Sequence, residues 1–171
     1  IDTISAHCKD ITAIIGAPSI NPDSKGKKLY NSAYFIENGH IKQIISKSLL
    51  PNYDVFDENR YFEQNTEFNI IEHKGYRIAL TICEDIWNLN KDPMYKFNPM
   101  DELYKYQPDC MINIAASPFS YSHREERIKV LKKNTNKYKL PVYYINQVGA
   151  QTDLIFDGGS MVLDKDANII H

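Results

Sequence analysis

Short apolar runs separated by polar segments dominate the first half of the chain and predict strands rather than helices. Residues 11–17 form an apolar run that Pro18 stops, a pattern typical of a buried strand. Two later runs flank a short segment that contains Asn38-Gly39, the strongest local signal for a β-hairpin. The two strands of this hairpin are expected at residues 31–36 and 41–45. The polar residues 21–28 before them are expected to form a loop.

The second half alternates further strands with two helices. The runs at 67–72 and 76–82 predict a second hairpin that turns at Gly75. The pattern at 123–138 predicts the longest helix, with Ile128, Leu131 and Thr135 on one face and Lys and Arg side chains opposite. A shorter helix and three more strands are expected at residues 100–106, 110–115, 141–145 and 160–163. Hairpins interrupted by a few helices favour α/β layers with a mixed sheet.

Composition places the chain among ordinary globular proteins. Its 171 residues suit one domain, and 43% hydrophobic with 25% charged residues is normal for that class. A net charge of −2 implies neither nucleic acid nor an anionic membrane as a partner, and no apolar run approaches the roughly 18 residues of a membrane span. Three scattered cysteines fit a reducing cytosol, so a cytoplasmic location is expected, and no ligand spacing predicts a metal site.

Cys83 is the first candidate for chemistry, because the apolar run 78–82 ends in this thiol and two carboxylates, Glu84 and Asp85. A cysteine at the end of a buried strand enters a turn, where its sulfur can meet a substrate and the next backbone N–H groups can hold an oxyanion. Cysteine also commonly fills space in a core, and this run by itself leaves both interpretations open. Carboxylates beside a thiolate raise its pKa, so the expected role of Glu84 and Asp85 is to hydrogen-bond the turn.

Lys47 follows the first hairpin and also has two interpretations. Most lysines at strand ends are solvated. The alternative is a cation delivered next to Cys83, where it would favour the thiolate and stabilise negative charge on a reacting carbonyl. Spacing leaves both open. The segment that follows, residues 49–65, is expected to be a long ordered loop, which is usually functional in a compact domain.

Longer segments carry more specific patterns. They are KSLLPNYDVFDENRYF at 47–62, ICEDIW at 82–87, NIAASPF at 113–119, and NQVGAQ with FDGGS within 146–160. In this order they resemble the carbon–nitrogen hydrolase (nitrilase) superfamily and, within it, the glutaminase domain of glutamine-dependent NAD synthetases. The resemblance covers most of residues 30–164. The segment Asp157-Gly158-Gly159-Ser160 also looks like a phosphate-binding loop, although two glycines at a strand entry are typical of a tight turn.

The resemblance implies roles for several of these residues. Cys83 would attack the side-chain amide of glutamine, form a thioester and release ammonia, and water would then release glutamate. Lys47 and the backbone N–H of Glu84 would hold the oxyanion. Glu58 falls where these enzymes place a supporting glutamate; its other interpretation is a surface carboxylate paired with Arg60.

Glutamine contacts are implied at Tyr53 and Ser117, which are otherwise a half-buried loop aromatic and an ordinary turn residue. The third contact is usually a basic residue six positions after Ser117, which here is His123. Arg124 follows it and suits the α-carboxylate of glutamine better, because its charge is permanent and its guanidinium is a fork. Which of the two anchors the carboxylate stays open, and both can equally be a helix N-terminal pair with no substrate role.

The resemblance further implies the fold class, an α/β nitrilase-like α-β-β-α sandwich, with residues 1–171 as an incomplete glutamine amidohydrolase domain. The chain starts at Ile1, and residues 167–171 look like the start of a strand, so both ends are expected to be cuts. The family's general base is a glutamate upstream of the strand at 11–17, and residues 1–10 contain none. That glutamate, the first strand and helix, and an ATP-dependent synthetase domain are expected to be absent, so this chain alone is expected to be nearly inactive.

The implied partners are glutamine, the synthetase domain of the same polypeptide and further copies of the chain. Ammonia would serve the ATP-dependent amidation of deaminated NAD to NAD, with ATP and Mg bound only in the synthetase domain and no cofactor in this one. Two other functions stay open. One is a free-standing amidase of the same family that acts on another amide, and the other is a non-catalytic structural module.

Overall fold

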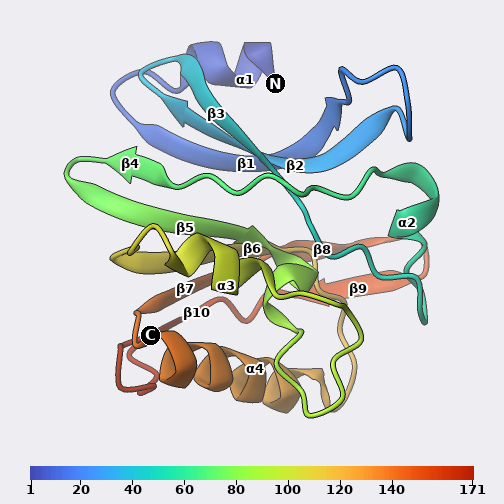
Figure 1. Ribbon diagram of the computed structural model, residues 1–171, viewed down its shortest axis with the longest axis vertical. Helices are drawn as coiled ribbons and strands as arrows, with labels where there is room; N and C mark the ends of the chain where they lie inside the picture. Colours follow the sequence, from blue (N-terminus) through green and yellow to red (C-terminus); the bar gives the residue numbers. More distant parts are fainter. The chain divides into compact units, whose positions relative to one another are not determined.

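The computed structural model describes residues 1–171, which divide into two compact units, 1–68 and 69–171. The first unit contains an antiparallel sheet in the order β1-β2-β3 (Figure 1). Its elements are α1 (Asp2–His7), β1 (Thr12–Ile20), β2 (Leu29–Glu37), β3 (His40–Ser46) and the single turn α2 (Glu58–Tyr61). The buried side chains of Cys8, Tyr34 and Ile36 form a cluster of its core.

The hairpin between β2 and β3 follows directly from its turn residues. Asn38 and Gly39 both have positive φ, 49° and 80°, as a two-residue turn that matches the strand twist requires. Glu37 pairs with His40 across this turn. The predicted hairpin is therefore confirmed, with strands one or two residues longer at their ends.

The prediction for the first strand was wrong in two respects. β1 continues through Pro18 to Ile20, and most of its residues are half-buried or exposed instead of buried. β1 lies at the edge of its sheet, where it pairs only with β2. A proline is tolerated in such a strand, because one side of an edge strand needs no N–H donor. The apolar residues are explained by packing on one face, where Ala13, Ile15 and Ala17 contact the core cluster.

The second unit contains a five-stranded mixed sheet in the order β10-β7-β6-β5-β4 (Figure 1). Strands β5, β6 and β7 run parallel, and β4 and β10 run antiparallel to their neighbours. The strands are β4 (Ile71–His73), β5 (Tyr76–Ile82), β6 (Cys110–Ala115), β7 (Val142–Asn146) and β10 (Met161–Leu163). The mixed sheet that the sequence favoured is confirmed, although β4 is much shorter than the predicted strand 67–72.

Helices and a separate hairpin complete this unit. They are the 3₁₀ turn η1 (Cys83–Ile86), α3 (Pro99–Tyr104), α4 (His123–Tyr138), and the hairpin of β8 (Val148–Gln151) with β9 (Leu154–Asp157). α3 and α4 contact each other, since the hydroxyl of Tyr138 donates to Asp101 at 2.8 Å and accepts from Asn98 at 3.1 Å. The bounds predicted for α4 are confirmed. Neither α1 nor the β8–β9 hairpin was predicted, because both are short and largely exposed.

The prediction that the Lys and Arg side chains of α4 lie on its exposed face was wrong for one residue. Leu131 and Thr135 are buried as expected, but Arg127, assigned to the solvent side, is 1% exposed. A fully buried arginine is rare unless its charge is paired and its N–H groups are satisfied. Arg127 therefore marks a place where the helix meets polar partners.

Candidate functional site

Cys83 lies at the turn where β5 ends, as its apolar run predicted. Its backbone has φ +44°, a left-handed conformation that is uncommon for a residue with a Cβ and often marks a functional turn. The carboxylate of Asp85 accepts the backbone N–H of Ile82 at 3.0 Å and so ties the turn to the end of the strand. The thiol is half-buried. Cys83 is thus the first residue of η1, at a sharp turn from strand to 3₁₀ helix.

Neighbouring strands bring more polar residues to the same edge of the sheet. Because β5, β6 and β7 run parallel in adjacent positions, their carboxyl ends meet there, the usual place of ligand sites in α/β sheets. Ser117 follows β6, and Asn146 ends β7. Below the turn, the side-chain amide of Asn113 donates to Thr81 at 2.9 Å and to the carbonyl of Cys83 at 3.4 Å. The edge therefore assembles a thiol with hydroxyl and amide groups from segments far apart in the sequence.

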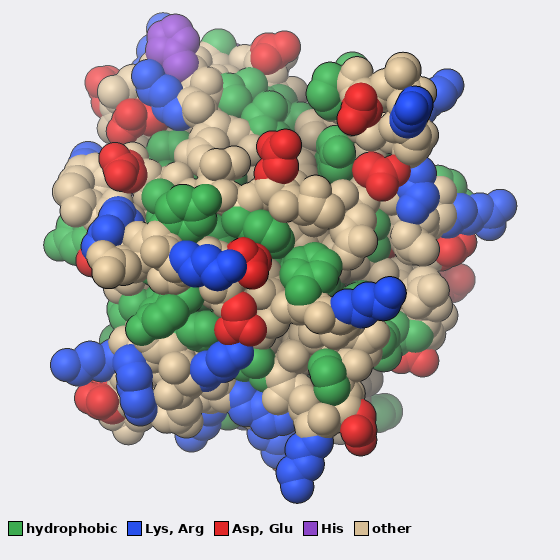
Figure 2. Space-filling model, in the orientation of Figure 1, with side chains coloured by type: hydrophobic (Ala, Val, Ile, Leu, Met, Phe, Trp, Pro, Cys, Tyr) green, Lys and Arg blue, Asp and Glu red, His purple; other side chains and the backbone are tan.

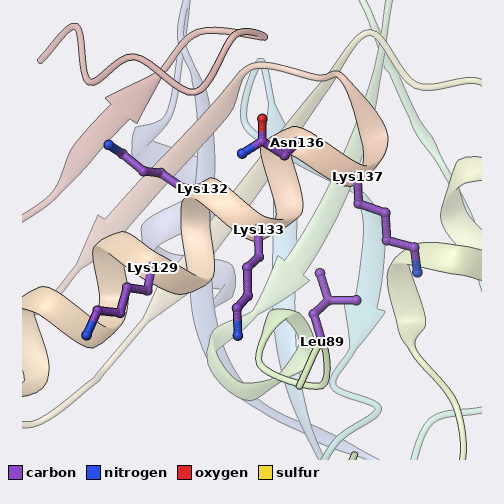
Figure 3. Close-up of a pocket in the computed structure, with 6 residues that line it drawn as sticks. All are labelled: Leu89, Lys129, Lys132, Lys133, Asn136 and Lys137. Carbon is purple, nitrogen blue, oxygen red and sulfur yellow. The ribbon is translucent and has the colours of Figure 1, made fainter. Parts of the chain in front are cut away.

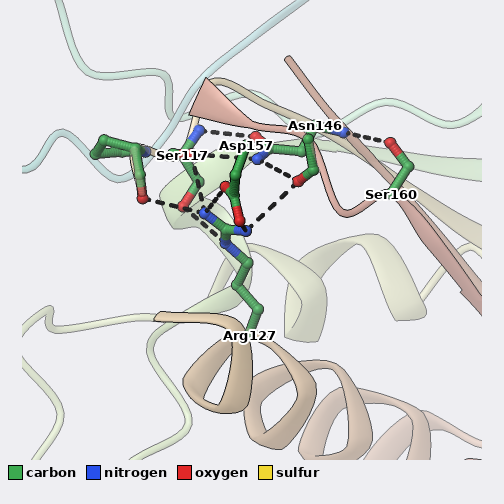
Figure 4. A network of polar contacts seen from close by, with 7 residues as sticks. Ser117, Arg127, Asn146, Asp157 and Ser160 are labelled. Atoms are coloured by element: carbon green, nitrogen blue, oxygen red, sulfur yellow. Dashed lines mark hydrogen bonds and ion pairs between the residues drawn. The ribbon is translucent and has the colours of Figure 1, made fainter. Parts of the chain in front are cut away.

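Arg127 is the centre of a hydrogen-bond network at this edge (Figure 4). Its guanidinium donates to both carboxylate oxygens of Asp157, at 2.9 and 3.2 Å. It also donates to the carbonyls of Ser117, Pro118 and Gly158 and, through Nε, to the hydroxyl of Ser117. These partners come from the loop after β6 and from the end of β9 with the residue that follows it. Sequence reasoning missed Arg127, because a basic residue on an amphipathic helix is normally solvated.

The network explains the glycine pair after β9. Gly158 and Gly159 both have φ +69°, the conformation of a tight turn that favours glycine. The carbonyl of Gly158 accepts from Arg127 and from the amide of Asn146, the latter at 2.7 Å. In this segment the carbonyl of Gly158 therefore acts as a hydrogen-bond acceptor for Arg127, and the two glycines form the tight turn that was expected as the alternative to a phosphate-binding loop.

Asp157 should make the stability of this unit depend on pH. Its hydrogen bonds to Arg127 hold the pKa of the carboxyl below its usual value. Because the unfolded chain then binds the proton at higher pH than the folded one, the stabilisation is present at neutral pH and is lost as pH falls through the lowered pKa. We expect Asp157→Asn to lower the free energy of unfolding at pH 7, and the difference from wild type to shrink toward pH 3.

Urea unfolding at several pH values measures this difference. Asp57→Asn serves as the control, because Asp57 pairs with Arg60 at 3.5 Å with both side chains more than half exposed, and such pairs contribute little. A wild-type to Asp157→Asn difference that stays constant from pH 7 to pH 3 would contradict the assignment.

His123 and Arg124, the two candidates for the carboxylate anchor, begin α4. The ring of His123 is half-buried and meets Trp87 edge-on, with ring centroids 5.8 Å apart, and its Nδ1 is buried without a hydrogen-bond partner. Arg124 is exposed. The structure joins neither side chain to Ser117, and the choice of an anchor between them stays a prediction.

Glu84 is the second residue of η1, and its side chain is buried. The hydroxyl of Tyr95 donates to its Oε1 at 3.2 Å. The side chain is therefore used inside the fold, where it accepts from Tyr95, and the bond to the turn that was expected of the two carboxylates is made by Asp85. The role predicted for its backbone N–H, as an oxyanion donor, stays a prediction.

In the first unit, Lys47 and Glu58 form a close ion pair. Lys47 is 1% exposed, and its Nζ lies 2.6 Å from Oε1 of Glu58. Asn31 donates to the other carboxylate oxygen at 3.0 Å. Both solvated alternatives are thereby wrong, because Lys47 is buried and Arg60 pairs with Asp57 instead of Glu58. The ammonium of Lys47 is therefore fixed in position by the carboxylate of Glu58.

Tyr53 lies in the long segment after Lys47. That segment is irregular except for α2 and an isolated bridge between Leu29 and Phe62, so the predicted ordered loop is confirmed apart from one helical turn. The Tyr53 ring is half-buried and meets Phe56 edge-on, with centroids 5.8 Å apart. Its role as a glutamine contact stays a prediction.

The other two cysteines are poorer nucleophile candidates. Cys110, at the first position of β6, pairs with Ile78 near the start of β5, whereas Cys83 follows the end of that strand. Burial, with a smaller effect of Asp109, raises the pKa of the Cys110 thiol and so keeps it protonated. Cys8 is buried in the core cluster of the first unit, where its thiol donates to the carbonyl of Ile4. The position of Cys83 at the carboxyl end of β5 thus favours it over the other two cysteines.

A hollow lies along the solvent side of α4 (Figure 3). It is lined by Leu89, Lys129, Lys132, Lys133, Asn136 and Lys137. Lys133 donates to Asn90 and Lys137 pairs with Asp101 at 2.6 Å. Basic side chains also gather at the lower edge of the molecule in Figure 2. This hollow contains neither a nucleophile nor a carboxylate, so it is a weaker candidate than the edge with Cys83.

Two further features bear on function. No three His, Cys, Asp or Glu side chains are grouped in a way that could hold a metal ion. No helix has the length and apolar character needed to cross a lipid bilayer.

Comparisons with known proteins agree with this picture. The pattern of the family described as Carbon-nitrogen hydrolase matches residues 3–171. The glutamine-dependent NAD(+) synthetase of Synechocystis sp. is 41% identical over 147 residues, which are 84% of this chain and 26% of that protein. The enzyme of the same name from Acinetobacter baylyi is 32% identical over 94% of this chain and 28% of its own length. The chain thus spans about a quarter of the length of these curated relatives.

Solved structures give the same result. The glutamine-dependent NAD+ synthetase of Acinetobacter baumannii, in complex with adenosine diphosphate, superposes with a TM-score of 0.86 at 32% identity, over 99% of this chain and 30% of that one. The carbon-nitrogen hydrolase of Helicobacter pylori G27 superposes with a TM-score of 0.77 at 20% identity, over 99% of this chain and 59% of that one. The second likeness concerns the fold only. Together they confirm the fold class implied by the resemblance.

Proposed function

The chain belongs to the carbon-nitrogen hydrolase family, and from this premise we propose that it carries the glutamine-hydrolysing site of a glutamine-dependent NAD synthetase. The relatives with that name support the proposal, since they match 84% and 94% of the chain at 41% and 32% identity. The observation that carries the chemistry is Cys83, which sits at φ +44° on a strand-to-3₁₀ turn.

The reaction proceeds in two displacements at one carbonyl. The sulfur of Cys83 attacks the side-chain carbonyl carbon of glutamine, and the tetrahedral intermediate expels ammonia as the C–N bond breaks. Water then attacks the resulting thioester, the C–S bond breaks, and glutamate leaves with the thiol restored. A general base takes the proton of the thiol and returns it to the leaving nitrogen, so that ammonia leaves as a neutral molecule; we assign this role to no residue of this chain.

Negative charge on the substrate oxygen needs donors in both displacements. We assign this role to Lys47 and to the backbone N–H of Glu84, the second residue of η1. Glu58 would hold the ammonium of Lys47 in place, since their 2.6 Å ion pair orients the lysine. Tyr53, Ser117 and either His123 or Arg124 would bind the rest of glutamine.

The ammonia would serve an ATP-dependent amidation of deaminated NAD, for which ATP and Mg would bind outside this domain. The glycine pair at 158–159 forms a tight turn in which the carbonyl of Gly158 accepts from Arg127 and Asn146.

Glutamine hydrolysis by the full-length gene product tests this function. We expect the release of glutamate and ammonia, and we expect a glutamine-like diazo-ketone to label Cys83 selectively, as located by peptide mass spectrometry. Faster hydrolysis of simple aliphatic amides than of glutamine would favour the free-standing amidase. Absence of both hydrolysis and selective labelling would leave a non-catalytic module and refute the proposal.

A further inference from the structure

Arg127 cannot itself meet a substrate, and its position requires another explanation. The side chain is 1% exposed, and all six of its hydrogen bonds go to protein groups. Its charge is balanced by the two-pronged contact with Asp157. Replacing a buried ion pair by apolar residues is often neutral or stabilising, so stability alone is a weak reason for this one. What the pair does supply is a fixed geometry for the groups around it.

Those groups converge on Ser117. Arg127 donates to its carbonyl at 3.1 Å, and Asn146 both donates to that carbonyl at 3.1 Å and accepts the Ser117 N–H at 2.8 Å. Asn146 is in turn held by Ser160, whose hydroxyl accepts the Asn146 N–H at 3.0 Å. Both backbone polar groups of Ser117 are thereby bound, which fixes the position of its backbone.

The Ser117 hydroxyl is also given one role. Its oxygen accepts from Nε of Arg127 at 3.3 Å. A serine hydroxyl has a single hydrogen, and an oxygen that accepts from a cation directs that hydrogen to another acceptor. Ser117 is therefore prepared to donate, which suits an anionic or carbonyl oxygen of a ligand.

We propose that Arg127 and Asp157 are positioning residues that hold Ser117 as a hydrogen-bond donor to the α-carboxylate of glutamine. The inference rests on the proposed glutaminase function and extends it to two residues that never touch the substrate. Asp157 keeps the guanidinium neutralised and correctly rotated, and Arg127 transmits that orientation to Ser117. The pair thereby sets the affinity for glutamine while the attack by Cys83 is left unchanged.

Steady-state glutamine hydrolysis by the full-length gene product tests the pair. Arg127→Lys keeps the charge but loses the fork, and Asp157→Asn keeps the shape but loses the charge. We expect each to raise KM for glutamine by about tenfold or more and to change kcat by less than about threefold, because a substrate contact is lost equally in the ground and transition states. Arg77→Lys is the matched control, since Arg77 lies at the other end of β5 and donates to the carbonyl of Tyr106; its KM should equal that of wild type.

A double-mutant cycle that combines Ser117→Ala with Arg127→Lys or with Asp157→Asn shows whether the pair acts through Ser117 or only stabilises the fold. If Arg127 and Asp157 act through Ser117, either variant should raise KM by less than about twofold in the Ser117→Ala background. Should Arg127→Lys fail to fold, Asp157→Asn completes the same cycle. Equal increases of KM in both backgrounds, or a loss of kcat with KM unchanged, would overturn the inference. A wild-type protein that does not hydrolyse glutamine would instead refute the proposed function.

Discussion

Replacing Cys83 by alanine is expected to abolish glutamine hydrolysis, with kcat lower by about 10⁴-fold or more, as when an enzyme loses its nucleophile. The thiol is the only part of the residue that the reaction needs. Alanine keeps the Cβ at φ +44°, so the substitution adds no backbone strain. The measurement is glutamate release by the purified full-length variant, with its thermal unfolding compared to that of wild type.

Cys110→Ala is the matched control for this experiment. It removes a thiol from the same sheet, but from the start of β6, where burial keeps the thiol protonated. Its rate should equal that of wild type. A folded Cys83→Ala variant that retains more than about a hundredth of the wild-type kcat would exclude Cys83 as the nucleophile, since that residual rate far exceeds the expected one.

Replacing Lys47 by methionine is expected to lower kcat by about 10²–10³-fold, the usual effect of removing one oxyanion donor. Methionine fills a similar volume without the charge. Glu58 would then lose the cation that it contacts at 2.6 Å and would retain its hydrogen bond from Asn31. Because Lys47 is buried, we also expect a lower melting temperature, so rates should be measured well below it.

Glu58→Gln identifies the role of the ion pair. If Glu58 acts by orienting Lys47, Glu58→Gln should lower kcat in the wild-type background and have little further effect in Lys47→Met. Lys42→Met is the control, because Lys42 is an exposed lysine of β3, the strand that leads to Lys47. A Lys47→Met enzyme within about threefold of the wild-type kcat would contradict the oxyanion role, for which a much larger loss is usual.

Local signals were sufficient for several parts of the fold. The bounds of α4 and β6 follow from the spacing of apolar residues, and the turn at Asn38-Gly39 follows from the positive φ that these residue types tolerate. The position of Cys83 in a strand-end turn follows from the apolar run before it. Each of these features depends on neighbours within a few residues, so the sequence carries the signal directly.

Other features had no local signal. β1 continues through Pro18 because it lies at a sheet edge, and the edge is a property of the sheet. The β8–β9 hairpin is mostly exposed, so it lacks the alternation of buried and polar residues that identifies a strand. The hairpin is defined by the pairing of β8 with β9, from Val148 with Asp157 to Gln151 with Leu154.

For the candidate site, the sequence by itself identified the candidate thiol, its place at the end of a strand, and the family whose motifs surround it. Only the tertiary structure decided that Lys47 is buried against Glu58 and that Arg127 is buried with Asp157 beside Ser117. The reason is physical. A charged side chain is stable in a buried place only when distant segments supply its partners, and Asp157 lies 30 residues from Arg127. The periodicity of apolar residues reflects the average preference of each residue type for burial or exposure. The partners that allow a charged residue to be buried come together only in the folded chain.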